Sequence, residues 1–265
     1  MTDAEATESP DLLENSGRED RYRAPALDKG LDILELLSTQ SGGMTRGEIV
    51  KAMGRSPSEI YRMLERLVVR DYVARSPEGD RYSLSMKLFV LAHRHPPVRR
   101  LVSRATPLMD AFASQARQSL HLVVQDRGKG LVAAQAHCPA NWEFGVRVGA
   151  RIDLLHTGSG HTLLAFQDEI AREDLERRWQ ETDGAAQLEA LGPTLETIRK
   201  TGYRIGASQQ IRGVDDISVP ILNPDGYALA VLTCPYLERL DQPGHASIDE
   251  TMGLLQSLAQ TLSLE

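Results

Sequence analysis

Two helix starts that lie close together constrain this chain more than any other feature of its sequence. Thr45-Arg46-Gly47-Glu48 has the order of a capping box, in which the threonine hydroxyl accepts a backbone amide and the glutamate reaches back to the cap. Ser56-Pro57-Ser58-Glu59 repeats that order, with proline at the first helical position, where its missing N–H costs nothing. Gly54 separates the two helices. Helix, tight turn and helix in this order predict a helix-turn-helix motif.

Apolar periodicity predicts the helices around that turn. From Ala26 to Ser38, leucines recur at three- and four-residue steps, which indicates a helix with one buried stripe, ended by Gly42 and Gly43. That stripe is expected to consist of Leu27, Leu31, Leu34 and Leu37. The second helix of the motif is expected to turn Ile60, Leu64, Leu67 and Val68 inward.

A strand-like pair follows the motif. Tyr72–Arg75 and Arg81–Leu84 flank turn residues and predict a β-hairpin of the wing type. A helix over Ser85–Ala92 then runs into His93–Pro97, whose two prolines prevent helical continuation. We therefore expect four regions: a disordered acidic tail at 1–22, a winged helix-turn-helix domain at 23–85, a linker helix with a proline hinge at 86–100, and a larger domain at 101–265.

The larger region mixes helical and strand periods, which predicts an α+β fold. Two turn segments, 126–130 and 223–226, each join a pair of its expected strands. The strands are expected at 119–125, 131–136, 144–148, 203–205, 216–222 and 227–234. The helices are expected at 98–118, 160–167, 168–182, 187–202 and 248–262.

Charge is distributed unevenly along the chain. The net charge is −7, yet residues 21–100 carry fifteen lysines and arginines against nine acidic residues. A basic block between two acidic segments is typical of a surface that neutralises phosphates, because Lys and Arg release the counterions condensed on DNA. On charge alone, a solvated basic surface without a partner remains an alternative.

The remaining composition indicates a globular cytoplasmic protein without a membrane segment. No apolar run approaches the roughly 18 residues needed to span a bilayer. The first twenty residues are acidic and polar, unlike a secretory signal. Two cysteines, Cys138 and Cys234, are too few for a disulfide framework and are expected as small core or pocket-wall residues.

From about Ala26 onward the chain resembles the IclR family of bacterial transcriptional regulators. The segments that carry the resemblance are ALDKGLDILELLS, MTRGEIVKAMGRSPSEIYRMLERLVVRDYV, RYSLSMKLFVLA, VRVGARIDLLHTGSGHTLLAF and KTGYRIGASQQIRGVDDISVPILNPDG. The resemblance implies a winged helix-turn-helix, a linker helix and a GAF-like domain with a mainly antiparallel sheet flanked by helices. It also implies assembly as a dimer or tetramer, and an effector whose binding changes operator affinity.

The sequence departs from that family at pocket positions. Members commonly have Gly-Lys where this chain has Gly160-His161, and many place an acidic pair where it has Gly206-Ala207. Members that sense small carboxylates tend to place a cysteine and two serines at the positions of Asp216, Val231 and Thr233. The resemblance therefore argues against a short α-keto acid as the ligand.

In the basic half, the helix that begins after Ser56 is expected to enter the major groove of a palindromic DNA operator. Arg62 can donate two hydrogen bonds to guanine, and the serine hydroxyls near the helix start suit phosphate or base contacts. The predicted DNA-binding residues are Arg46, Arg55, Ser56, Ser58, Tyr61, Arg62, Arg75 and Arg81. A homodimer or a dimer of dimers is expected, since two such helices must lie about one helical turn of DNA apart. The helices at 26–38 and 85–92 are plausible contact surfaces.

In the larger domain, His156 to His161 opens a helix whose free amides favour a polar or anionic ligand group, although a simple strand-to-helix turn is an alternative. Apolar wall is expected from Phe144, Val146 and Val148, with Asp216 positioned to accept from a ligand hydroxyl or amine. The predicted effector-binding residues are Phe144, Val146, His156, Gly158, Ser159, Asp216, Val231 and Thr233. They indicate a largely apolar or aromatic effector anchored by few polar groups.

Catalysis is not expected. Gly158-Ser159-Gly160 is not the nucleophile elbow of a hydrolase, no pair of ligands has metal-site spacing, and no phosphate or dinucleotide loop is present. We therefore expect no catalytic residue, no metal and no cofactor. Two alternatives stay open: a sensor or interaction protein whose winged helix contacts protein rather than DNA, and an enzyme of small-molecule metabolism.

Overall fold

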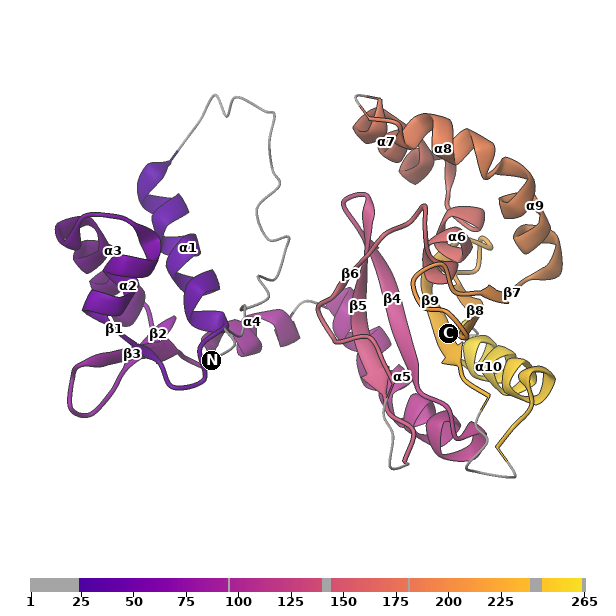
Figure 1. Cartoon of the computed structure of the whole chain (residues 1–265), viewed down its shortest axis with the longest axis horizontal. Coiled ribbons are helices and arrows are strands. Elements are labelled where there is room, and N and C mark those ends of the chain that lie inside the picture. Colours follow the sequence, from indigo (N-terminus) through magenta and orange to yellow (C-terminus); the bar gives the residue numbers. More distant parts are fainter. Residues whose placement is uncertain (1–23, 95, 140–143, 181, 239–244, 264–265) are drawn as a thin grey trace, which may run out of the picture. The chain divides into compact units, whose positions relative to one another are not determined.

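The computed structural model describes residues 24–94, 96–139, 144–180, 182–238 and 245–263 (Figure 1). The chain divides into two units, with the division after Arg94. The tail expected at 1–22 lies outside the described residues.

The N-terminal unit is a helix-turn-helix with a small sheet. Its helices are α1 (Pro25–Ser38), α2 (Arg46–Met53), α3 (Pro57–Val69) and α4 (Lys87–Arg94). Its antiparallel sheet has the order β1-β3-β2 and consists of β1 (Met44–Thr45), β2 (Val73–Arg75) and β3 (Arg81–Leu84). The helix-turn-helix and the wing are confirmed, whereas the two-residue strand β1 was too short for the periodicity to indicate.

Local hydrogen bonds set the starts of α2 and α3. The Thr45 hydroxyl accepts the Glu48 amide at 3.3 Å, and the Glu48 carboxylate accepts the Thr45 amide at 2.7 Å. The predicted first capping box is therefore present. Gly54 ends α2 with φ of 58°, a left-handed conformation that costs glycine little.

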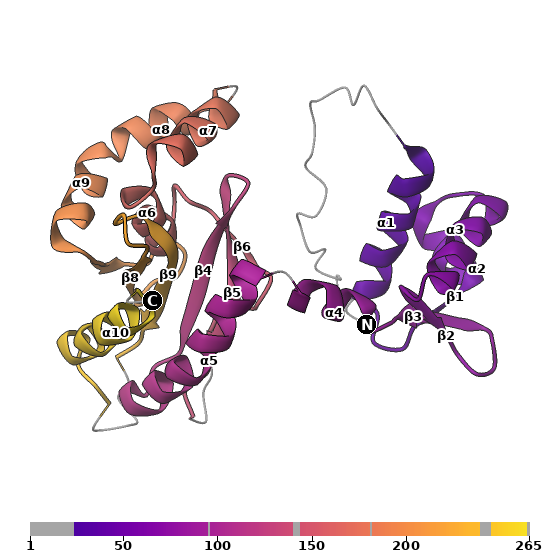
Figure 2. The same ribbon diagram turned by 180° about the vertical axis from the view of Figure 1, so that it is seen from behind.

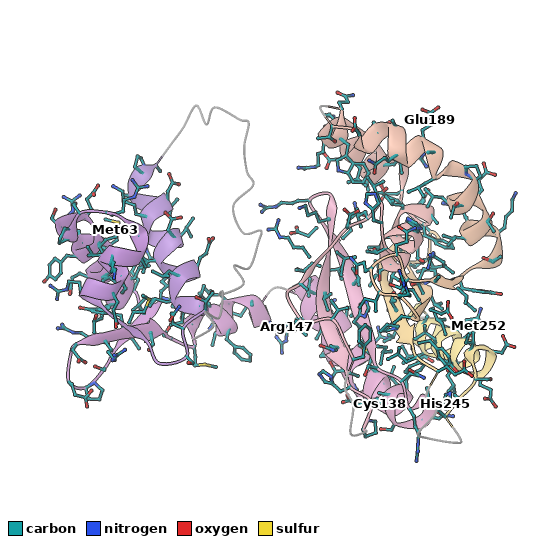
Figure 3. All side chains as sticks on the ribbon, viewed as in Figure 1. Met63, Cys138, Arg147, Glu189, His245 and Met252 are labelled. Carbon is teal, nitrogen blue, oxygen red and sulfur yellow. The ribbon has the colours of Figure 1, made fainter. Side chains whose placement is uncertain are left out.

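The predicted stripe of α1 is partly wrong. Leu27 and Leu31 are 60% and 48% exposed, whereas Ile33 and Leu37 are buried. Helix α1 carries apolar residues on more than one side, so leucine spacing alone did not identify the buried side. The stripe of α3 is confirmed: Ile60 and Leu64 are fully buried and Leu67 and Val68 pack against them. Met63, labelled in Figure 3, also packs on this core.

The C-terminal unit is a six-stranded antiparallel sheet with helices on both faces, which confirms the α+β class (Figures 1 and 2). The strand order is β6-β5-β4-β9-β8-β7. The strands are β4 (Leu120–Asp126), β5 (Lys129–Ala136), β6 (Arg151–Ile152), β7 (Arg204–Ala207), β8 (Asp215–Leu222) and β9 (Ala228–Tyr236). The helices are α5 (Pro96–Ala116), α6 (Gly158–Ala165), α7 (Glu169–Trp179), α8 (Gly184–Ala190), α9 (Gly192–Thr201) and α10 (Ile248–Ser263).

Three predicted elements of this unit need correction. Phe144–Val148 is not a strand, and the edge strand is β6 instead. The helix expected at 187–202 is two helices, α8 and α9, because the chain restarts at Gly192-Pro193. The helix expected at 98–118 is α5, which begins at Pro96, because proline is tolerated in the first turn of a helix.

Each face of the sheet carries its own apolar cluster. Leu122, Ile217 and Leu232 pack with α5 and α10, including Met252, which Figure 3 labels. Val123 and Val231 pack with α6 on the other face. Because side chains alternate along a strand, the residues next to the first group face α6. The register pairs His121 with Thr233 and Ser218 with Thr233, which brings polar groups together on the α6 face.

Candidate functional site

The outward side of α3 carries most of the residues predicted to contact DNA. Arg55, Ser56, Ser58 and Arg62 are exposed, and Tyr61 is 43% exposed. Ile60 and Leu64 on the opposite side are fully buried. The helix therefore presents a polar, arginine-bearing face while its aliphatic face holds the unit together.

The acidic residue at the start of α3 is already paired. Lys29 donates to the Glu59 carboxylate, which also accepts from the Ser56 hydroxyl at 2.8 Å. These contacts lower the pKa of Glu59 to about 2, and the hydrogen bond from Lys29 has the largest effect. Within the described part of the chain, no ion pair or hydrogen bond engages the guanidinium of Arg55 or Arg62. Both charges are therefore available to an external anion.

Three other predicted arginines are engaged within the unit. Arg46 lies over the Tyr61 ring, 4.5 Å from its centroid. Arg75 donates to the Gly79 carbonyl at 2.6 Å and Arg81 donates to the Gly43 carbonyl at 3.0 Å. Arg75 and Arg81 thus fix the shape of the wing, and each keeps further N–H groups for a ligand.

A cavity with about 400 Å³ of empty space, part of it open to solvent, lies on the α6 side of the C-terminal sheet. Its walls are formed by His121, Phe144, Val146, Ile152, Thr157, Ser159, Ser208, Gln210, Ile211, Val214, Asp216, Thr233 and Pro235. Strands β4, β8 and β9, the start of α6 and the segments around 144–146 and 208–214 all contribute. The walls combine apolar side chains with several hydroxyl groups and one carboxylate, a mixture typical of small-molecule sites.

The structure brings five of the eight predicted effector-binding residues into this wall: Phe144, Val146, Ser159, Asp216 and Thr233. The other three lie elsewhere. His156 is exposed, with its Nδ1 3.2 Å from Asp153 Oδ1. Val231 is fully buried in the apolar cluster under α6. Gly158 opens α6, and Val148, expected as apolar wall, is 61% exposed.

Four buried polar groups, three of them in the cavity wall, form a chain of hydrogen bonds. Ser218 Oγ lies 2.9 Å from Thr233 Oγ1, which lies 2.8 Å from Ser159 Oγ. Ser159 Oγ in turn lies 3.4 Å from His121 Nε2. Burial lowers the pKa of His121 to about 4, so the ring is neutral at physiological pH.

Asp216 lies where β8 meets the start of α6. A Cβ added at Gly158 would be 2.8 Å from Asp216 Cβ and 2.8 Å from one terminal nitrogen of Arg204. Burial raises the pKa of Asp216, while the Arg204 charge and hydrogen bonds from Ser208 and the Gly158 amide oppose that rise. Only a glycine at 158 permits this close approach.

His121 is the main wall residue that the sequence did not single out. It faces the cavity because it alternates with Leu122 on β4 and pairs with Thr233 on β9. Nothing near His121 in the sequence indicates that pairing. The wall residues Ile152, Thr157, Ser208, Gln210, Ile211, Val214 and Pro235 were also missed.

Across the described residues, no three His, Cys, Asp or Glu side chains gather closely enough to hold a metal ion. No described helix is long and apolar enough to cross a membrane. Cys138 and Cys234 are buried and not joined in a disulfide.

Comparison with known families matches both units in order. The model "IclR helix-turn-helix domain" matches residues 26–77, and "Bacterial transcriptional regulator IclR C-terminal" matches residues 97–264. The second match alone spans more than half of the chain.

Individual proteins agree with these matches. The chain is 25% identical over 232 residues to the HTH-type transcriptional regulator XynR of Escherichia coli, covering 86% of this chain and 92% of XynR. It is 30% identical over 229 residues to the HTH-type transcriptional regulator BhcR of Paracoccus denitrificans, covering 81% and 78% of the two chains. Among solved structures, an IclR homologue from Microbacterium hydrocarbonoxydans complexed with 4-hydroxybenzoate has the same fold, with a TM-score of 0.71 at 21% identity, covering 90% of this chain and 97% of that one. The chain therefore belongs to the IclR family of bacterial transcriptional regulators, and its two units are the helix-turn-helix and C-terminal domains of that family.

Proposed function

We propose that this ligand-responsive, DNA-binding regulator represses a small-molecule catabolic or transport operon until an effector fills the cavity of its C-terminal unit. It acts in the cytoplasm, through binding and not through catalysis. The observation that carries the proposal is the exposed face of α3, on which Arg55 and Arg62 have no partner among the residues that the structure describes.

The proposal gives a role to each predicted DNA-binding residue. Arg62 donates two hydrogen bonds to a guanine, with Ser56, Ser58 and Tyr61 contacting bases or phosphates beside it. Arg46 and Arg55 bind backbone phosphates. The wing arginines, Arg75 and Arg81, keep their internal contacts and reach the flanking DNA with their remaining N–H groups.

We propose a homodimer, or a dimer of dimers, on a palindromic operator. Leu27 and Leu31 on α1 and Met86 and Phe89 at α4 are large apolar side chains that are about half exposed or more. Apolar area of this kind is typical of surfaces that another protein covers. A second copy covering them would set the spacing of two α3 helices to one helical turn of DNA.

The effector is proposed to be a small, largely apolar or aromatic compound. Phe144, Val146, Ile152 and Val214 supply apolar wall, and the hydroxyls of Ser159 and Thr233 supply polar contacts. Two relatives carry the same suggestion in their names: the homologue complexed with 4-hydroxybenzoate, and the p-hydroxybenzoate hydroxylase transcriptional activator of Acinetobacter baylyi.

A gel shift with DNA from upstream of the protein's own gene tests the proposal. Arg62→Ala should weaken operator binding by about 1–3 kcal/mol, which is roughly 5- to 150-fold, without changing the melting temperature. Arg177→Ala is the matched control, because Arg177 is an exposed arginine on α7 of the C-terminal unit. Equal binding by both variants at the same salt concentration would favour the alternative, a winged helix that contacts protein. Mass spectrometry of compounds retained by the purified protein would supply the ligand for a second shift.

A further inference from the structure

The start of α6 is the part of the cavity best suited to an anion, yet the chain fills that place itself. Free amides at a helix N-terminus attract negative charge. Here the Thr157 hydroxyl accepts the Gly160 amide at 3.0 Å. The Gly158 amide is bonded to the Asp216 carboxylate, and a Cβ at Gly158 would be 3.2 Å from Asp216 Oδ2. The carboxylate of Asp216 therefore lies against the helix start, where a ligand carboxylate would otherwise bind.

His121 points independently to a ligand. Its side chain is only 4% exposed, lines the cavity, and has no hydrogen-bond partner for Nδ1 among the described residues. A buried polar atom without a partner costs free energy that a ligand group can recover.

The chain of hydrogen bonds that includes His121 indicates which group its ring offers. If Ser218 donates to Thr233, Thr233 to Ser159 and Ser159 to His121 Nε2, every hydroxyl hydrogen is used. The neutral ring then carries its one hydrogen on Nδ1 and offers a donor. In the reverse direction His121 Nε2 would donate, and two buried groups would stay unsatisfied: Nδ1, and the hydrogen of the fully buried Ser218 hydroxyl.

Charge in the cavity wall has one sign. Among the described wall residues there is no lysine or arginine, and Asp216 is the one carboxylate. Arg204 lies beside Asp216 and Gly158 but does not line the cavity, and one of its terminal nitrogens is buried without a hydrogen-bond partner. A carboxylate in the cavity would meet Asp216 before it met a cation.

We propose that Asp216 is a built-in anion at the start of α6, and that with His121 it makes this cavity select an uncharged ring compound bearing a hydroxyl or carbonyl group over the corresponding carboxylate. The inference rests on the proposed function, because it takes the cavity to be the effector site. To the proposed function the inference adds the charge of the effector and the two residues, Asp216 and His121, that select it.

The proposal predicts that shortening residue 216 converts the preference. Asp216→Ser removes the charge and leaves space, so that the Gly158 amide and the unpaired nitrogen of Arg204 become available to a ligand carboxylate. Asp216→Asn removes the charge and keeps the volume, so its effect should be smaller. Asp215→Asn is the matched control, because Asp215 precedes Asp216 on β8 and its side chain points to the other face of the sheet.

The experiment compares 4-hydroxybenzyl alcohol with 4-hydroxybenzoate by isothermal titration calorimetry on the full chain. Affinity for 4-hydroxybenzoate should rise at least tenfold in Asp216→Ser and less in Asp216→Asn, with no change in Asp215→Asn. Wild type should bind the alcohol more tightly than the acid. His121→Phe should bind the alcohol more weakly than wild type does, or not at all. Melting temperatures and gel shifts without probe show whether each variant is folded.

Three results would overturn the inference: wild type binding the acid as tightly as Asp216→Ser, no gain of acid binding in that variant, or an equal gain in Asp215→Asn. Failure of the proposed function would look different. In that case wild type would not shift operator DNA, whatever the variants do with the two probes.

Discussion

The two units differ in whether their polar groups are exposed or buried. In the N-terminal unit, neighbouring residues fix the starts of α2 and α3, as Thr45 and Glu48 do for α2, and the polar face of α3 is left open to solvent. In the C-terminal unit, β4, β9 and α6, which are distant in the sequence, bring His121, Thr233 and Ser159 together and bury them. The first arrangement suits a long, charged partner, and the second suits a small one that must be enclosed.

Backbone crowding gives the sharpest contrast between the units. A Cβ at Gly160 would lie 2.4 Å from both the Cα and the carbonyl oxygen of Leu154, whereas a Cβ at Gly47 in α2 meets nothing within 4 Å. Gly160→Ala should therefore lower the free energy of unfolding by about 3 kcal/mol or more. Gly47→Ala should be neutral or stabilising by up to about 1 kcal/mol, because alanine favours a helix. Urea denaturation measures both, and equal effects would remove the contrast.

Acid should affect the C-terminal unit through His121. Because the folded protein holds the pKa of His121 near 4, below the ordinary 6.5, the neutral ring stabilises the fold at pH above about 6.5. That contribution, about 3 kcal/mol, should be lost as the pH falls from 6.5 towards 4. His121→Gln should show a smaller loss of stability over the same pH range. Parallel curves for the two proteins would show that the ring is not buried as described.

A capping variant tests how far local signals carry the N-terminal unit. Thr45→Ala removes the side-chain oxygen that accepts the Glu48 amide and should cost about 1 kcal/mol of unfolding free energy. Thr45→Ser is a suitable control, since it keeps the hydroxyl that accepts the Glu48 amide. If the two variants lost equal stability in thermal denaturation, the capping box would not be what sets the start of α2.

What the sequence could predict follows the same division. Capping residues and the stripe of Ile60 and Leu64 act over one or two turns, so the helix-turn-helix was predictable from neighbours alone. The alternation in Phe144–Val148 imitated a strand because Phe144 and Val146 face the cavity from an irregular segment. The helical periodicity of 187–202 continues through Gly192-Pro193, so it did not reveal that α8 ends and α9 begins there.

The cavity was only partly predictable, for a physical reason. Ser159 and Asp216 lie in segments that carry the family resemblance, and Thr233 aligns with a pocket position of the family, so these three positions could be inferred. His121 depends on the pairing of β4 with β9. Val231 and Thr233 share a face of β9, yet only Thr233 lines the cavity. Neither the strand register nor the extent of the cavity along a strand is indicated by the residues near these positions.

The most direct test of the account measures salt dependence. Fluorescence anisotropy of a labelled operator duplex, titrated from about 50 to 200 mM salt, gives the slope of log affinity against log salt concentration. If the open face of α3 binds DNA, the slope should be steep for wild type and smaller in magnitude by about 1 for Arg55→Ala, because one phosphate contact is lost. A slope that is flat for wild type, or identical in the two proteins, would contradict the claim that this face contacts the duplex.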